Sequence, residues 1–274
     1  MNRRGGARLS VLALATALAG LGGCGDETVP AADLGARLFA NSKLSPSPIN
    51  AFSCATCHPV VVTELADADA GAPPDAGPTD RHPGPIHPGY NLFDSVHRPS
   101  WWGGTETRLL DAMNYCLVEF MGGAALDATA PSARELYEYL KTVSPDDPSP
   151  ALSLTVVKNI DGLLALKAGA DPARGGDVFG RGCRGCHGQP HTGEGKLGSK
   201  TSIVPEDTIT GPVCNPNHDP GALTNPAALA CARTVVVEKV RHGKFFNIGG
   251  TMPLYSIETL SDVEIADVLA FLGL

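Results

Sequence analysis

Two pentapeptides decide the fold of this chain: Cys54-Ala55-Thr56-Cys57-His58 and Cys183-Arg184-Gly185-Cys186-His187. Each places two thiols one helical turn apart and follows the second thiol directly with an imidazole. Four cysteines in two such pairs could form one zinc site, and either pair could be a redox dithiol. Neither chemistry requires the next residue to be histidine, so both leave the two imidazoles unexplained.

A c-type haem at each pentapeptide accounts for both thiols and for the histidine. The thiols reach the two vinyl groups of the porphyrin, and the adjoining imidazole lands under the iron as its proximal ligand. We therefore predict two covalently bound haem c groups, attached at Cys54, Cys57, Cys183 and Cys186, with His58 and His187 as proximal iron ligands.

The composition is consistent with an interior that is partly filled by such groups. Of the 274 residues, 43% are hydrophobic but only 5% are aromatic, so large core side chains are scarce. Buried porphyrins would supply the missing apolar surface. The 32 glycines and 23 prolines indicate many loops between short elements. A formal charge of −8 excludes a general nucleic-acid-binding protein, because neutralising phosphates requires a basic face.

The first 23 residues have the pattern of an export signal. Three arginines precede an apolar run over 9–21, which is too short to span a membrane as a helix. The end of this run, Leu21-Gly22-Gly23-Cys24, resembles the lipobox of bacterial lipoproteins, which implies acylation of Cys24. We expect a signal peptide over 1–23, and a lipid anchor that holds the protein on the periplasmic side of the cell envelope.

Similar helix patterns surround both pentapeptides. Asp33 is a candidate cap for a helix before the first one, and Asp171-Pro172 opens a helix before the second. Middle helices are expected over about 105–121 and about 232–242. A closing helix begins at Pro131 in the first half and at the capping box of Ser261 and Glu264 in the second. Their expected apolar faces are Ala133, Leu136, Tyr137 and Leu140, and Ile265, Val268, Leu269 and Leu272.

This order of elements in each half resembles the class I cytochrome c family. The resemblance implies an all-α fold of two tandem class I cytochrome c domains, with long irregular loops and covalently bound haem. We expect the first domain over 24–143, a linker and strap over 144–170 and the second domain over 171–274. The boundary falls in the proline-rich stretch 144–150, after which 152–160 is a strand or an extended strap.

One stretch of the first half lacks large apolar residues. Residues from about 66 to 89 are mainly Ala, Asp, Pro and Gly, which predicts a flexible surface insertion. His82 and His87 fall within it and are expected to be surface histidines rather than iron ligands.

The sixth iron ligand decides whether a haem only transfers electrons or also has an open position for a substrate. In the second half, Met252 lies in Gly249-Gly250-Thr251-Met252-Pro253, between the middle and closing helices, where class I cytochromes place their methionine. The glycines permit a close backbone approach. We predict that Met252 is the distal ligand opposite His187.

The first half leaves its distal ligand open. Cys116 shares one face of the middle helix with Leu109, Met113 and Phe120, which directs it inward. The run from Asn114 through Cys116 and Met121 to Gly123 resembles that of di-haem thiosulfate dehydrogenases, whose first haem takes a cysteine sulfur. This resemblance implies Cys116. The alternatives are Met121, His97, a histidine of the insertion or an open position. Cys214 and Cys231 can pair, which leaves Cys116 single.

A shorter likeness precedes the first pentapeptide. Residues 34–39, Leu44-Ser45 and 54–58 resemble the opening of bacterial di-haem cytochrome c peroxidases, and 98–103 extend the likeness. The second half does not continue it. Trp101 and Trp102 could form an electron path at a haem edge, but packing is the simpler interpretation.

Two classes of function follow. We favour an electron carrier that serves redox protein partners, because nothing beyond haem supplies a base, a nucleophile or a further cofactor, and the acidic surface can steer a basic partner. The alternative is a di-haem oxidoreductase of the thiosulfate dehydrogenase type, or less plausibly a peroxidase, with its chemistry at the His58 haem. That alternative needs basic residues such as Arg98 or Arg108 to hold an anion, and we interpret both as ion-pair or haem propionate contacts.

Overall fold

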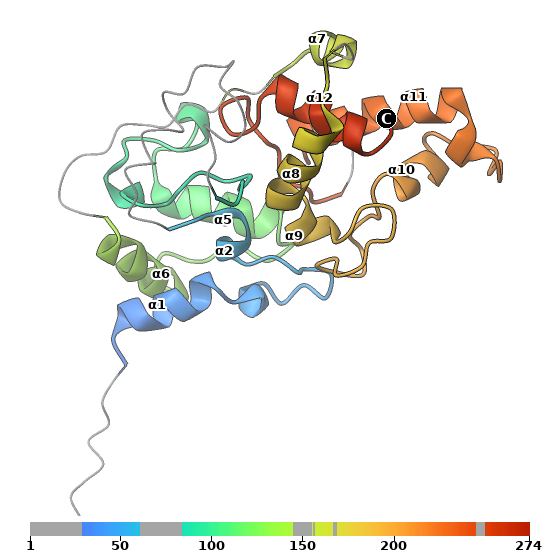
Figure 1. Ribbon diagram of the computed structural model, residues 1–274. Coiled ribbons are helices and arrows are strands. Elements are labelled where there is room, and N and C mark those ends of the chain that lie inside the picture. Colours follow the sequence, from blue (N-terminus) through green and yellow to red (C-terminus); the bar gives the residue numbers. More distant parts are fainter. Residues whose placement is uncertain (1–28, 61–83, 145–154, 156, 167–168, 245–249) are drawn as a thin grey trace, which may run out of the picture.

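The computed structural model describes residues 29–60, 84–144, 155, 157–166, 169–244 and 250–274 (Figure 1). The expected signal peptide, Cys24, His82 and most of the linker lie outside these residues. The described residues form helices joined by irregular segments and contain no β-strand, apart from an isolated bridge between Trp101 and Glu106. The all-α class is therefore confirmed. Within the same ranges, no helix is both long and apolar enough to cross a membrane.

The N-terminal half contains short helical elements and two longer helices. They are α1 (Ala31–Phe39), η1 (Ser42–Leu44), α2 (Cys54–Cys57), η3 (Ser95–His97), η4 (Trp102–Gly104), α5 (Leu109–Glu119) and α6 (Pro131–Thr142). The C-terminal half contains α7 (Asp161–Ala165), α8 (Pro172–Gly182), α9 (Arg184–His187), α10 (Glu206–Thr210), η5 (Ala222–Thr224), α11 (Pro226–His242) and α12 (Asp262–Phe271).

The capping signals explain most helix starts. The Asp171 side chain accepts hydrogen bonds at the start of α8, and Ser261 and Glu264 form the expected capping box of α12. The expectation for Asp33 is wrong, because α1 begins after Pro30 and Asp33 lies in its first turn. Helix α11 begins well before 232, because Asn225 caps it at Pro226.

In both halves the helix before the pentapeptide, α1 or α8, crosses the last helix, α6 or α12, at a glycine (Figure 1). A Cβ on Gly35 of α1 would lie 1.9 Å from the Glu135 carbonyl oxygen of α6, and one on Gly175 of α8 would lie 2.0 Å from that of Asp267 of α12. Aromatic rings one turn further on pack across each crossing: Phe39 against Tyr139 at 5.3 Å, and Phe179 against Phe271 at 5.7 Å between centroids. The two halves thus repeat one helix-packing arrangement.

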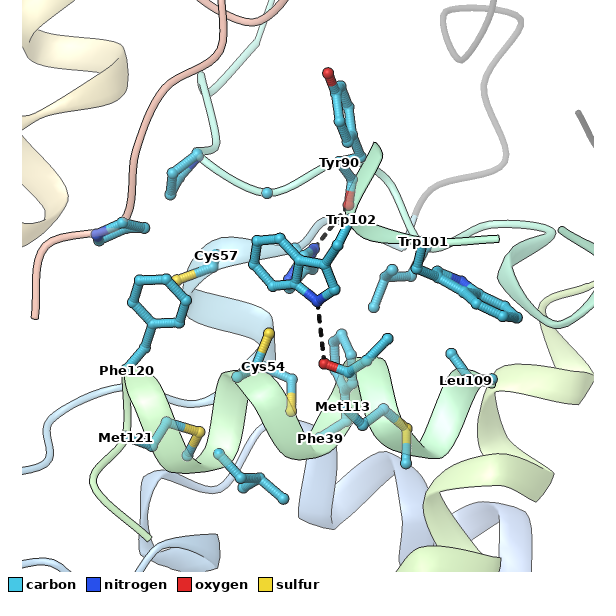
Figure 2. Close-up of a pocket in the computed structure, with 18 of the residues that line it drawn as sticks. Phe39, Cys54, Cys57, Tyr90, Trp101, Trp102, Leu109, Met113, Phe120 and Met121 are labelled. Carbon is cyan, nitrogen blue, oxygen red and sulfur yellow. Dashed lines mark hydrogen bonds between the residues drawn. The ribbon is translucent and has the colours of Figure 1, made fainter. Parts of the chain in front are cut away.

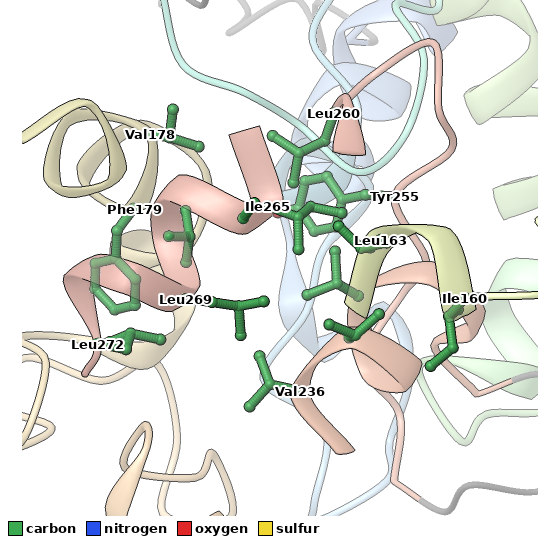
Figure 3. Packing of buried hydrophobic residues seen from close by; sticks show 14 of the residues in the cluster. Ile160, Leu163, Val178, Phe179, Val236, Tyr255, Leu260, Ile265, Leu269 and Leu272 are labelled. Carbon is green, nitrogen blue, oxygen red and sulfur yellow. The ribbon is translucent and has the colours of Figure 1, made fainter. Parts of the chain in front are cut away.

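The buried cores of the two halves differ in size. The C-terminal core joins α7, α8, α11 and α12 through Leu163, Val178, Phe179, Val237, Ile265 and Leu269 (Figure 3). The N-terminal core has three fully buried members, Phe39, Leu136 and Leu140. Tyr137, expected on the buried face of α6, is 45% exposed. Leu136 and Leu140 are buried as expected, whereas Tyr137 lies at the edge of the narrow apolar stripe of this helix.

Two further links fix the C-terminal half. A disulfide joins Cys214 to Cys231 and thereby ties a loop to α11. Arg174 donates two hydrogen bonds to Asp267, whose side chain is fully buried and also accepts the Asp171 amide. These contacts hold the start of α8 against α12.

The C-terminal end of the predicted surface insertion differs from the expectation. Residues 66–83 lie outside the described residues, but Ile86 is 3% exposed and belongs to the C-terminal core. Its amide donates to the Arg181 carbonyl oxygen of α8. Ile86 is the large apolar residue of this end, and its burial anchors this end of the stretch to the C-terminal core, although Pro85 beside it is exposed. His87 is half-buried.

Candidate haem-binding site

The first pentapeptide opens into a large apolar cavity of the N-terminal half (Figure 2). The space measures about 1420 Å³, including its part open to solvent, and Cys54, Cys57 and His58 line it. The apolar walls come from α1, α5 and α6 and include Phe39, Leu109, Leu117, Phe120, Leu136 and Leu140. The small N-terminal core therefore surrounds a space that its own side chains do not fill.

His58 is held in one orientation by a backbone carbonyl. Its Nδ1 lies 2.9 Å from the Tyr90 carbonyl oxygen, which can only accept, so Nδ1 carries the proton and Nε2 holds the lone pair (Figure 2). Burial lowers the pKa of His58 and keeps the ring neutral. Gly89 packs on the ring so closely that a Cβ there would lie 2.3 Å from its Cε1 atom.

His187 shows the same arrangement in the C-terminal half. Its Nδ1 lies 2.9 Å from the Ser202 carbonyl oxygen, and burial again lowers the pKa of the ring. A neutral imidazole fixed through Nδ1 is the form in which histidine binds a metal through Nε2. Both predicted proximal ligands therefore have the tautomer that iron ligation requires.

The four thiols of the pentapeptides lie in apolar surroundings. Burial raises the pKa of Cys54 to about 11, and that of Cys57 and of Cys183 to about 12. Burial raises the pKa of Cys186 as well. Redox dithiols instead lie in electropositive, partly exposed sites that lower the thiol pKa. The environment thus tells against the dithiol alternative and suits thiols consumed in covalent attachment.

Both leading candidates for the distal ligand of the first site line the cavity. Cys116 projects from α5 on the same side as Leu109, Met113 and Phe120, as the sequence predicted. Burial and then the nearby Cys54 and Cys57 thiols raise its pKa. Met121 is 4% exposed, and its carbonyl oxygen accepts the Ser45 hydroxyl at 2.7 Å. His87 and His97 are not among the cavity-lining residues.

Met252 lies on a segment between the two pentapeptides. It is half-buried and packs against the C-terminal core, while the next two residues, Pro253 and Leu254, line the cavity around His58. The same segment therefore borders both candidate sites.

Arg241 holds this segment, and sequence reasoning missed it. Its side chain is fully buried at the end of α11, and Nη1 donates to the carbonyl oxygens of Tyr255, Ser256 and Leu260 at 2.7–3.2 Å. Its other nitrogens donate to Asp262. An arginine in a basic helix end is usual, so no feature of the sequence distinguishes Arg241 for this role.

Buried donors at the cavity provide a test of whether a haem fits. Arg98 lines the cavity and is 9% exposed; one of its Nη atoms donates to two carbonyl oxygens, but its Nε has no hydrogen-bond partner among the described residues. The same holds for the indole nitrogen of Trp101, also a lining residue. Unpaired donors at an apolar cavity are placed to donate hydrogen bonds to the propionate carboxylates of a porphyrin. Arg108 is instead exposed and pairs with Asp111 at 3.5 Å.

Comparison with known families bears on the C-terminal half. Residues 170–272 match the family described as cytochrome c oxidase, cbb3-type, subunit III. Residues 170–272 form a cytochrome c domain. This domain contains the second pentapeptide, the crossing of α8 and α12, and Met252, and it carries at least one haem c. The match does not include the first pentapeptide. A search of curated proteins found no match.

Proposed function

We propose that this chain is an exported di-haem c-type cytochrome that transfers electrons between redox protein partners. The observation that carries the proposal is the repeated site geometry. His58 and His187 both bind a downstream carbonyl oxygen through Nδ1 at 2.9 Å, and both follow two half-buried cysteines. The half that contains His58 also repeats the glycine-centred helix crossing of the cytochrome c domain.

In this proposal each pentapeptide holds one haem, whose iron supplies reversible one-electron transfer between its ferric and ferrous states. Cys54 and Cys57 are the attachment sites of the first haem, and Cys183 and Cys186 are those of the second. His58 and His187 serve as proximal ligands, fixed by their carbonyl partners. The apolar walls around the first site suit the faces of a porphyrin, and Arg98 and Trp101 offer donors to the propionates.

For the distal ligands we propose Met252 in the second site and Cys116 in the first. Cys116 is favoured over Met121 because it lies beside the Cys54 and Cys57 thiols and projects from the wall formed by α5. Binding to iron also stabilises a buried thiol as a thiolate, because the positive charge of the metal offsets the cost of burying the negative sulfur.

We further propose that the mature protein begins at Cys24 as a lipoprotein on the periplasmic side of the envelope. The N-terminal haem domain then covers 24–143, the linker and strap 144–170 and the second haem domain 171–274. A lipid anchor would keep the carrier close to membrane-bound redox enzymes.

Stepwise reduction of the purified holoprotein tests the carrier function. We expect two haems to be reduced by a small protein donor and reoxidised by a protein acceptor, with no turnover of thiosulfate or peroxide. Salt should slow the reaction with a basic partner, because screening weakens steering by an acidic surface. Turnover of thiosulfate or peroxide at rates above those of free haem would contradict the carrier proposal.

One observation favours a second candidate, an oxidoreductase of the thiosulfate dehydrogenase type. The cavity at His58 is open to solvent, and Cys116 lines it. An anionic substrate would need a cation there, yet Arg98 is turned toward the carbonyl oxygens of Asn91 and Phe93 and Arg108 pairs with Asp111. The electron carrier therefore fits the described residues better.

A further inference from the structure

The segment 86–92 passes from one half of the molecule to the other and contacts the His58 ring on the way. At its start, Ile86 is buried in the C-terminal core and its amide donates to the Arg181 carbonyl oxygen, two residues before Cys183. Further along, the Gly89 amide donates to the Cys57 carbonyl oxygen and the Tyr90 carbonyl oxygen holds His58.

Tyr90 joins the two halves within one residue. Its carbonyl oxygen lies 2.9 Å from His58 Nδ1, whereas its hydroxyl lies 3.1 Å from the Ser256 Oγ atom. Ser256 is 1% exposed and follows Met252 by four positions in the segment that Arg241 holds. Tyr90 therefore orients His58 through its carbonyl oxygen. Through its hydroxyl it contacts the segment that carries Met252, the predicted ligand of the second haem.

We propose that Tyr90 is a positioning residue through which the C-terminal half sets the strength of the His58 hydrogen bond, and thereby the reduction potential of the first haem. This inference rests on the proposed function, because it requires a haem at His58. It goes beyond that proposal because a contact made by the C-terminal half would influence an iron ligand of the N-terminal half. A carbonyl bound to Nδ1 makes the imidazole more basic and stabilises ferric iron. Loosening the contact between Tyr90 and Ser256 should therefore raise the potential of the first haem.

The test is a potentiometric titration of holoprotein variants. Met252→Leu first assigns the potentials, because loss of a direct iron ligand should shift the second haem by far more than the first. Tyr90→Phe removes the hydroxyl, Ser256→Ala removes its partner, and Tyr137→Phe on the exposed face of α6 is the matched control. We expect Tyr90→Phe and Ser256→Ala each to raise the potential of the first haem, with no change in Tyr137→Phe. The double variant should shift no further than Tyr90→Phe alone, because both remove the same contact.

A second readout separates positioning from general loosening. Paramagnetic proton spectra should show displaced hyperfine resonances of the His58 ring in Tyr90→Phe, and unchanged resonances of His187. Unchanged potentials, equal shifts of both haems, or fully additive shifts in the double variant would overturn the inference. If Tyr90→Phe fails to fold, Ser256→Ala alone decides. A wild-type protein without haem at the first pentapeptide would instead refute the proposed function, before any variant is compared.

Discussion

Gly175 of α8 lies so close to the backbone of α12 that a Cβ on it would be 2.0 Å from the Asp267 carbonyl oxygen. Gly35 stands in the same relation to Glu135, at 1.9 Å. No side chain fits at either position unless the helices separate, so the two crossings depend on glycine.

Alanine at either crossing glycine should destabilise the protein strongly. The backbone of the opposite helix cannot yield as a side chain can, so we expect Gly35→Ala and Gly175→Ala each to lower the free energy of unfolding by about 1–3 kcal/mol or more. Chemical denaturation of the holoproteins measures this loss.

Gly180→Ala is the matched control within α8. A Cβ there would meet nothing within 4 Å, and alanine is favoured over glycine in a helix by about 1 kcal/mol. We therefore expect Gly180→Ala to be neutral or stabilising. Equal stability of Gly175→Ala and Gly180→Ala would show that the helices do not pack at Gly175.

Gly89→Ala should disturb the ligation of the first haem. The new methyl group would lie 2.3 Å from Cε1 and 2.4 Å from Nδ1 of His58, which forces the ring away from the Tyr90 carbonyl oxygen. We expect a high-spin or mixed-spin contribution in the absorption spectrum of one haem, while the second haem is unchanged. Gly84→Ala, where a Cβ meets nothing, should retain the wild-type spectrum. An unaltered spectrum in Gly89→Ala would mean that His58 is not the ligand.

Arg241→Met should loosen the segment that carries Met252. The substitution leaves three carbonyl oxygens and the partly exposed Asp262 without their common donor, and leaving buried acceptors unsatisfied costs about 1–3 kcal/mol. We expect a large loss of stability together with a weakened methionine-type signal of the second haem.

The matched control for that variant is Arg134→Met, at an exposed position on α6. It should leave both stability and spectrum unchanged, because an exposed arginine makes few contacts. A stable Arg241→Met protein with an intact methionine signal would show that Met252 is held in some other way.

Substitution of the two cavity sulfurs distinguishes the distal ligands of the first haem. We expect wild-type protein to give a thiolate-type low-spin paramagnetic resonance signal, Cys116→Ser to lose it, and Met121→Leu to retain it. Both side chains line the cavity, so each variant probes the same space. A methionine-type signal of the first haem in the wild type, lost in Met121→Leu and unaffected by Cys116→Ser, would assign the ligand to Met121 instead.

Local signals in the sequence predicted two helix caps and the inward face of α5. The caps at Asp171 and Ser261 fix helix starts through hydrogen bonds within a few residues, so they can be read without tertiary structure. The periodicity of α5 likewise places Leu109, Met113 and Cys116 on the cavity wall.

Features that depend on contacts between distant segments could not be predicted in this way. Ile86 lies at the end of a polar, proline-rich stretch, yet it packs in the core of the other half. The three carbonyl partners of Arg241 depend on how the segment after α11 folds back on that helix, and the contact of Tyr90 with Ser256 depends on how the two halves meet. Tyr137 follows the correct period but lies at the edge of a narrow buried stripe, where periodicity alone does not decide exposure.

The central claim is that each pentapeptide carries one covalently bound haem, and intact mass combined with haem absorbance tests it most directly. Protein matured in a host that attaches c-type haem should carry two haems. Replacing Cys54 and Cys57 with alanine should remove the mass and absorbance of one haem, and replacing Cys183 and Cys186 should remove those of the other. A wild-type protein that carries a single haem, lost only with Cys183 and Cys186, would contradict the account.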